Sequence, residues 1–232
     1  MIGLTNRDLL LPYFVPYFAY VGIASMLANV ISIELNYLLR IAVVTPLIFW
    51  AWKWYAPISI SGQRFLSIAW GVGTGLAGCL LWCLLLAPFI DQAGEGTKPW
   101  STQGFLLRLF AATLLVPLFE EIAIRGYVLR LALQWDQGRK NKVAEPLMEA
   151  LDRSSLFDVK NGEWTVAAIL ISSIAFTLGH NTVEWLAAFA YSLLISWLWI
   201  KRGDLLSCIV AHGTTNFALA LFVFNTGSWG FW

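Results

Sequence analysis

Long apolar runs, separated by short polar breaks, fill most of this sequence of 232 residues. A helix of about 20 apolar residues crosses the hydrocarbon core of a membrane, and within lipid only helices and closed barrels satisfy every backbone hydrogen bond. The runs therefore predict an all-α fold, a polytopic transmembrane helical bundle of about seven (six to eight) spans. The expected spans are roughly Leu10–Val30, Leu35–Trp54, Phe65–Ile90, a run that starts near Gly104, Trp164–His180, Val183–Ile200 and Leu205–Phe224.

Composition supports the same fold class. The chain is 59% hydrophobic and only 12% charged, about half the charged fraction of an ordinary soluble domain. We expect residues 1–232 to form one integral membrane domain in the lipid bilayer. No basic stripe faces water, so we expect no nucleic-acid partner. The one long hydrophilic segment is Trp135–Glu163, where Ala144–Leu151 could form a short surface helix.

Three glycines of the third run, Gly71, Gly75 and Gly78, recur at helical spacing. Small residues in this arrangement allow a neighbouring helix to approach closely. The cysteines Cys79, Cys83 and Cys208 lie within apolar runs, and we predict that all three are buried free thiols.

The fourth run contains charges that are expensive in a membrane. Glu120 and Glu121 are adjacent, and Arg125 follows one helical turn after Glu121, so Glu121 can pair with Arg125 while Glu120 points about 100° away. Charged residues within a membrane span are functional candidates by default. Pro117 cannot donate a hydrogen bond to the carbonyl of the preceding turn, which predicts a kink and a locally open backbone just before the carboxylates.

Two further motifs have the same spacing of four residues, namely Phe176 with His180 and His212 with Asn216. The chain has only two histidines, and both fall in these motifs. Such a set allows amide hydrolysis. A water held by Glu120 and His180 could lose a proton as it attacks a carbonyl, and His212 and Asn216 could donate hydrogen bonds to the oxyanion.

Each motif also has a structural interpretation. Glu121 and Arg125 could be an ion pair that only supports the fold, His180 could meet water at the end of a span, and His212 with Asn216 could be a clamp between helices. A proton relay through the two glutamates of a small transporter is a further alternative. The coincidence of three polar motifs in one small apolar chain favours a common site.

The motifs Glu120-Glu121…Arg125, Phe176…His180 and His212…Asn216 resemble, in this order, the pattern of the CPBP family of CAAX prenyl endopeptidases and bacteriocin-processing or immunity (Abi) proteins. The resemblance covers about Thr113–Asn225, half the chain, within a motif-bearing core of about residues 104–225. It implies an intramembrane endopeptidase with Glu120, His180, His212 and Asn216 as catalytic residues and with Glu121, Arg125 and Phe176 in support. The substrate would be a peptide or protein in the membrane, either lipidated or not. The alternative within the family is a non-catalytic bacteriocin-immunity or membrane scaffold protein.

The resemblance leaves the role of metal to be tested. Glu120, His180 and His212 match a zinc site in number, but the chain has no HExxH helix, so we expect no required cofactor and keep zinc as the alternative. The depth of the motifs in the membrane presents a further question. If the helix that carries His180 were a straight span, His180 would lie far deeper in the membrane than Glu120. The motifs can meet only if that helix is strongly tilted or enters the bundle late.

Basic residues predict the orientation of the chain. With seven spans, most of them fall on one side, which the positive-inside rule assigns to the cytoplasm; Lys98 and Arg40 are the main exceptions. We therefore expect a bacterial inner-membrane protein with a cytoplasmic N-terminus and a site open to cytoplasmic water. The residues on that side are Arg7, Lys53, Arg64, Arg130, Arg139, Lys140, Lys142, Arg153, Lys160, Lys201 and Arg202.

Overall fold

The structure, a computed structural model, describes residues 3–59, 62–90 and 100–231. Within these ranges the fold is entirely helical, which confirms the predicted fold class. Lys98 and most of the loop around it lie outside the described residues. The main helices are α1 (Asn6–Met26), α2 (Ile33–Ala51), α3 (Arg64–Leu86), α5 (Thr102–Phe110), α6 (Val116–Glu121), α7 (Leu129–Lys140), α8 (Pro146–Asp152), α9 (Val166–Thr177), α10 (Trp185–Arg202) and α11 (Leu205–Thr226).

Five segments of the described chain are helical, long enough and apolar enough to cross a membrane: Asn6–Met26, Ile33–Trp54, Arg64–Phe89, Thr182–Arg202 and Leu205–Thr226. Their outward faces are strongly apolar, with Leu11, Phe18 and Phe65 more than 60% exposed. Such surfaces suit acyl chains rather than water. The protein is an integral membrane protein.

The centre of the bundle is one long helix that changes its hydrogen-bonding pattern twice. It runs without a break from Thr102 to Lys140 through α5, α6 and α7, with π-helical segments at Ala111–Leu115 and Ile122–Val128. At 1.5 Å per residue this helix is roughly 58 Å long, so its ends extend beyond a membrane core of ~30 Å. The locally open backbone predicted just before the carboxylates occurs as the first π segment, Ala111–Leu115, and the helix continues through Pro117.

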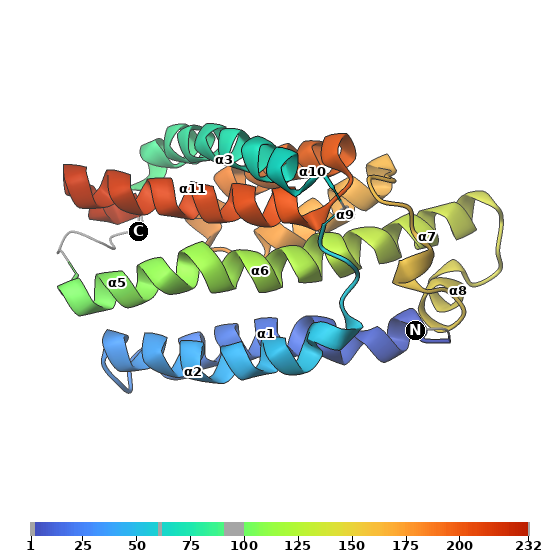
Figure 1. The fold of residues 1–232 in the computed structure, drawn as a ribbon, viewed down its shortest axis with the longest axis horizontal. Helices are drawn as coiled ribbons and strands as arrows, with labels where there is room; N and C mark the ends of the chain where they lie inside the picture. Colours follow the sequence, from blue (N-terminus) through green and yellow to red (C-terminus); the bar gives the residue numbers. More distant parts are fainter. Residues whose placement is uncertain (1–2, 60–61, 91–99, 232) are drawn as a thin grey trace.

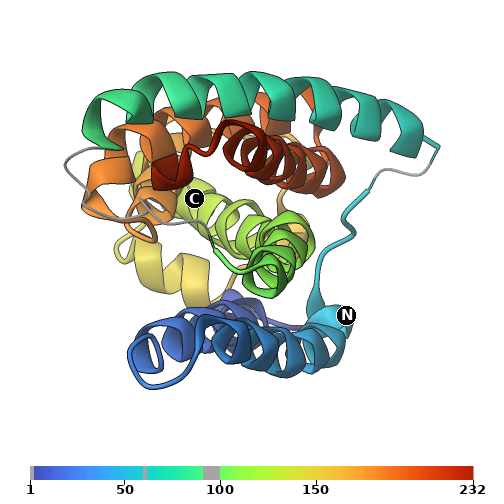
Figure 2. The ribbon, with the colours of Figure 1, turned by 90° about the vertical axis from the view of Figure 1, so that its left-hand side faces the viewer.

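The other helices surround this central helix. Figure 1 shows the pair α1 and α2 along one side and α11 with α3 along the other. In the view of Figure 2 the order is α1 and α2, then the central helix, then α11, with α3 outermost. The N-terminus, the end of α7 and the surface helix α8 lie at one end of the molecule (Figure 1).

The glycines of α3 pack against α11 as predicted. A Cβ at Gly75 would lie 2.5 Å from the carbonyl oxygen of Ala211, and one at Gly71 would lie 2.7 Å from Val210. Gly78 faces Tyr191 and Thr215 at similarly short distances. The hydroxyl of Thr215 also donates to the carbonyl oxygen of Gly75 at 2.8 Å. The contact therefore depends on glycine for its closeness.

The structure confirms part of what the sequence predicted for the cysteines and for the surface helix. All three cysteines are free thiols, but only Cys208 is fully buried, whereas Cys79 and Cys83 are half-buried. The surface helix expected at Ala144–Leu151 occurs as α8, Pro146–Asp152.

The expected span Trp164–His180 is shorter than predicted. Helix α9 begins at Val166 and ends at Thr177, and its 12 residues extend only about 18 Å. The chain then turns through residues 178–181 and returns along α10. Helices α9 and α10 thus form a hairpin whose turn carries His180, which answers the question of depth raised by the sequence.

Candidate active site

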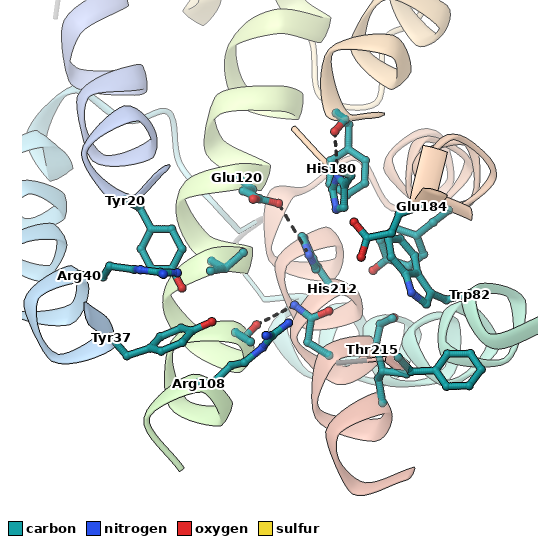
Figure 3. A pocket seen from close by; sticks show the side chains of 17 residues that line it. Tyr20, Tyr37, Arg40, Trp82, Arg108, Glu120, His180, Glu184, His212 and Thr215 are labelled. Atoms are coloured by element: carbon teal, nitrogen blue, oxygen red, sulfur yellow. Dashed lines mark hydrogen bonds and ion pairs between the residues drawn. The ribbon is translucent and has the colours of Figure 1, made fainter. Parts of the chain in front are cut away.

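A cavity of about 230 Å³ lies beside the central helix and brings the three sequence motifs together. Figure 3 shows Glu120, His180 and His212 pointing toward one another from three separate segments. The residues that line the cavity are Tyr20, Tyr37, Arg40, Trp82, Arg108, Ala112, Val116, Glu120, Phe176, His180, Glu184, Tyr191, His212, Thr215, Asn216, Leu219 and Phe231.

The second carboxylate of the pair is fully buried behind the cavity. Glu121 and Arg125 form an ion pair at 3.3 Å, and neither side chain is exposed to solvent. Arg125 also donates to the hydroxyl of Ser192 at 2.7 Å and to the carbonyl oxygen of Ser192 at 3.0 Å. Its guanidinium lies over the Phe176 ring, 5.2 Å from the centroid. These contacts hold Glu121 and fasten α10 and α9 to the central helix.

His212 joins the two carboxylates. Its Nδ1 lies 3.0 Å from Oε1 of Glu121, and its Nε2 lies 3.9 Å from Oε2 of Glu120. Because Glu120 is 16% exposed and lines the cavity, it faces the space where a substrate would bind. Glu121 instead orients the imidazole from behind, as a carboxylate does for many functional histidines.

His180 is oriented by its own helix end. Its Nδ1 lies 3.0 Å from the carbonyl oxygen of Phe176. Since a carbonyl oxygen can only accept, Nδ1 carries the hydrogen and Nε2 is left as an acceptor. The Phe176 ring packs against both histidines, with centroids 4.6 Å from His180 and 5.8 Å from His212. The Phe176 of the motif thus positions both rings.

Asn216 has a backbone partner that the sequence did not predict. Its Nδ2 donates to the carbonyl oxygen of Ala112 at 2.7 Å. In the π segment the N–H of Val116 bonds to Ala111, and residue 117, the next candidate donor for Ala112, is a proline without an N–H. Asn216 therefore satisfies a carbonyl that the helix itself leaves unpaired, and one hydrogen of its amide remains for another acceptor.

Several cavity residues escaped the sequence analysis: Tyr20, Tyr37, Arg40, Trp82, Arg108 and Glu184. The charged ones carried a usable signal, because Arg40 and Arg108 lie inside apolar segments just as Glu120 does. The aromatic ones carried none, since tyrosine and tryptophan are common throughout this chain.

No group of three or more His, Cys, Asp or Glu side chains is arranged to hold a metal ion in the part of the chain that the structure describes. Glu120 and His212 are close to each other, and His180 faces the same cavity. That no cofactor is required, with zinc as the alternative, stays a prediction that chelation can test.

Comparisons with known proteins agree with the geometry. The family model described as type II CAAX prenyl endopeptidase Rce1-like matches residues 102–218, half of the chain. The matched range begins with the central helix and includes all three motifs. A search of curated proteins and a search of solved structures each found no match.

Proposed function

The chain belongs to the Rce1-like family of type II CAAX prenyl endopeptidases, and on this premise we propose that it hydrolyses a peptide bond near the C-terminus of a membrane-associated peptide. The observation that carries the proposal is the cavity in which Glu120, His180 and His212 converge. Membrane proteases of this family act on membrane-associated peptides; the mechanism below is inferred from this chain's own residues.

Glu120 and His180 are suited to hold the attacking water. The carboxylate accepts hydrogen bonds, and the Nε2 of His180 is also an acceptor because its Nδ1 hydrogen is used by Phe176. A water donating to both would direct its oxygen lone pair away from them, toward a substrate carbonyl. Glu120 would take the proton as the oxygen attacks, as a general base.

His212 and Asn216 are suited to stabilise the oxyanion. His212 lines the cavity with its Nε2 3.9 Å from Oε2 of Glu120, and this nitrogen donates to an oxyanion when it carries a hydrogen. The second amide hydrogen of Asn216 is the other donor. One positioned donor of this kind contributes about 3–4 kcal/mol to lowering the barrier. The proton on Glu120 would then pass to the leaving amine.

The test is cleavage by the purified protein in liposomes. The substrates are prenylated and unprenylated C-terminal peptides, and the variants are Glu120→Gln and His180→Ala. Glu149→Gln, an exposed glutamate on α8 that pairs with Arg153, is the matched control. We expect cleavage by the wild type and the control, a loss of at least about a hundredfold in both site variants, and no effect of a chelator.

Three outcomes would contradict parts of this proposal. Loss on chelation with recovery on added zinc would replace the water activated by Glu120 with a metal-bound one. Full activity of Glu120→Gln would remove that residue from the mechanism. No cleavage of any peptide would favour the non-catalytic immunity or scaffold function.

A further inference from the structure

The cavity has a cationic side that the proposed mechanism does not use. Arg40 from α2 and Arg108 from α5 line it, together with Tyr20 and Tyr37. Figure 3 shows these four side chains grouped on the side of the cavity away from His180 and Glu184. An arginine inside a membrane bundle is expensive and calls for a functional explanation.

Arg40 is held in place by neutral groups. Its guanidinium lies over the Tyr37 ring at 4.3 Å and near the Tyr20 ring at 5.2 Å, and its Nε donates to the side-chain oxygen of Asn36. Cation–π contacts orient a guanidinium without neutralising it. Within the described residues Arg40 forms no ion pair, so its positive charge remains available to a ligand.

Arg108 supplies a second guanidinium from the central helix. It packs over the Trp100 ring, 4.8 Å from the centroid, and it also borders the cavity. Two arginines presented from neighbouring helices match a carboxylate well, because the planar guanidinium forms paired hydrogen bonds with carboxylate oxygens.

We propose that Arg40 and Arg108 form a subsite for the free C-terminal carboxylate of the peptide that is cleaved beside Glu120. This inference rests on the proposed function, since it places the carboxylate and the scissile bond in one cavity. It favours a peptide end over a lipid phosphate because the arginines share the cavity with Glu120, His180 and His212 instead of lying on the lipid-facing surface.

The subsite limits the length of the released peptide. Arg108 precedes Glu120 by 12 residues on the same helix, which is about 18 Å of axial distance. An extended peptide advances ~3.3 Å per residue, so the segment between the scissile bond and its C-terminus is at most about five residues long. Peptides whose C-terminus lies farther away would be poor substrates.

The test measures binding separately from cleavage. A labelled prenylated peptide is titrated against the Glu120→Gln variant in phosphatidylcholine liposomes, once with a free C-terminal carboxylate and once as its C-terminal amide. The acid and the amide are then titrated against four double variants. Each combines Glu120→Gln with one further substitution: Arg40→Gln, Arg108→Gln, Arg40→Lys or Arg108→Lys. Arg153→Gln, on the exposed α8 segment, is the matched control.

We expect the acid to bind at least about tenfold more tightly than the amide, as suits a charge-assisted pair. Each Gln variant should bring this ratio close to one, each Lys variant should keep part of it, and the control should retain it. A general loss of folding would weaken both peptides equally and would not remove the ratio, so the ratio reports on the subsite.

Equal binding of acid and amide to the Glu120→Gln protein would overturn the inference, as would an unchanged ratio in both Gln variants. A lipid ligand has its own signature: anionic phosphatidylglycerol would displace the peptide in an Arg40-dependent way, with acid and amide affected alike, and this would also overturn it. A normal ratio without cleavage by the wild type would reject the proposed function and support the subsite.

Discussion

Two adjacent carboxylates of this protein have opposite environments. Glu121 is fully buried and bonded to Arg125 and His212, whereas Glu120 borders a cavity, and among the described residues only His212 lies within ion-pair distance of it. The helix causes this difference, because successive side chains point about 100° apart. Glu121 is therefore a buried structural partner of Arg125 and His212, and Glu120 is the carboxylate that faces the cavity.

This difference predicts different effects on stability. Glu121→Gln leaves the guanidinium of Arg125 buried without its counter-ion, and breaking such a pair costs about 3–5 kcal/mol. Glu120→Gln should change the free energy of unfolding by less than about 1 kcal/mol, since its carboxylate faces the cavity. Thermal unfolding in detergent measures both variants. Equal losses of stability would mean that Glu120 is also a structural residue.

The residue types and their pairing could be predicted from the sequence, but the contacts between motifs could not. The spacing of four residues predicted the pair of Glu121 and Arg125, which the structure confirms. It could not show that His212 bonds to Glu121, because that contact joins residues 91 positions apart. Nor could it show the bond between Asn216 and Ala112, which depends on a π segment.

At the scale of the element, the central helix and α11 are joined at a defect in the helical hydrogen-bond ladder. Pro117 removes a donor, and the amide of Asn216 supplies one from the neighbouring helix. Gly213 lets the two backbones meet, since a Cβ there would lie 2.6 Å from the carbonyl oxygen of Thr113. The central helix is thus positioned against α11 by the hydrogen bond from Asn216 and by the close approach of the two backbones at Gly213.

A double-mutant cycle tests whether the amide of Asn216 replaces the N–H donor that Pro117 lacks. Asn216→Ala should cost about 1–3 kcal/mol, because it leaves the partly buried carbonyl of Ala112 without its hydrogen-bond donor. In the Pro117→Ala background the helix regains an N–H of its own, so the same change should cost at least about 1 kcal/mol less. Unfolding of the four proteins in detergent gives the coupling energy. A coupling near zero would separate Asn216 from the proline.

The contact between α3 and α11 provides a second test at this scale. Gly75→Ala places a methyl group 2.5 Å from a backbone carbonyl of α11, whereas Gly73→Ala meets no atom within 4 Å. We expect Gly75→Ala to destabilise the protein by about 1–3 kcal/mol, and Gly73→Ala to be neutral or slightly stabilising. Thermal unfolding distinguishes them. Similar stabilities of the two variants would show that α3 can shift relative to α11 without loss of stability.

The helical fold followed from the long apolar runs, but the lengths of two helices did not. Residues 164–180 are apolar enough to read as one span, yet the helix ends at Thr177 and the turn that follows carries His180. Only tertiary packing distinguishes a span from one arm of a hairpin. Similarly, the sequence predicted a run that starts near Gly104 and continues past Pro117, but not that this helix extends to Lys140.

At the scale of the whole molecule, the cavity extends from Glu120 away from the end that holds the N-terminus. The basic residues predict that the N-terminal end is cytoplasmic, and α5 begins at the opposite end (Figure 1). From Glu120 the cavity extends toward Arg108 of α5 and Arg40 of α2. Combined with a cytoplasmic N-terminus, this direction predicts access from the opposite side of the membrane, whereas the sequence analysis expected access from the cytoplasm.

This arrangement predicts from which side of the membrane a thiol reagent reaches the cavity. In a background without Cys79, Cys83 and Cys208, Arg40→Cys should react with a membrane-impermeant thiol reagent in intact cells. Arg153→Cys, beside α8, should react only after permeabilisation. Labelling in the reverse pattern would invert the orientation of the whole bundle, and labelling of both only after permeabilisation would place the cavity on the cytoplasmic side.

The short helix α9 also shapes the lipid around the protein. Its outward stripe of Val166, Leu170, Ile174 and Leu178 is 43–64% exposed but extends only about 18 Å. Acyl chains next to it meet a hydrophobic belt much thinner than the ~30 Å of an average bilayer, so the membrane must thin beside the turn that holds His180. Hydrophobic mismatch then acts directly on a site residue. Peptide cleavage should be fastest in short-chain phospholipids and slow as the acyl chains lengthen.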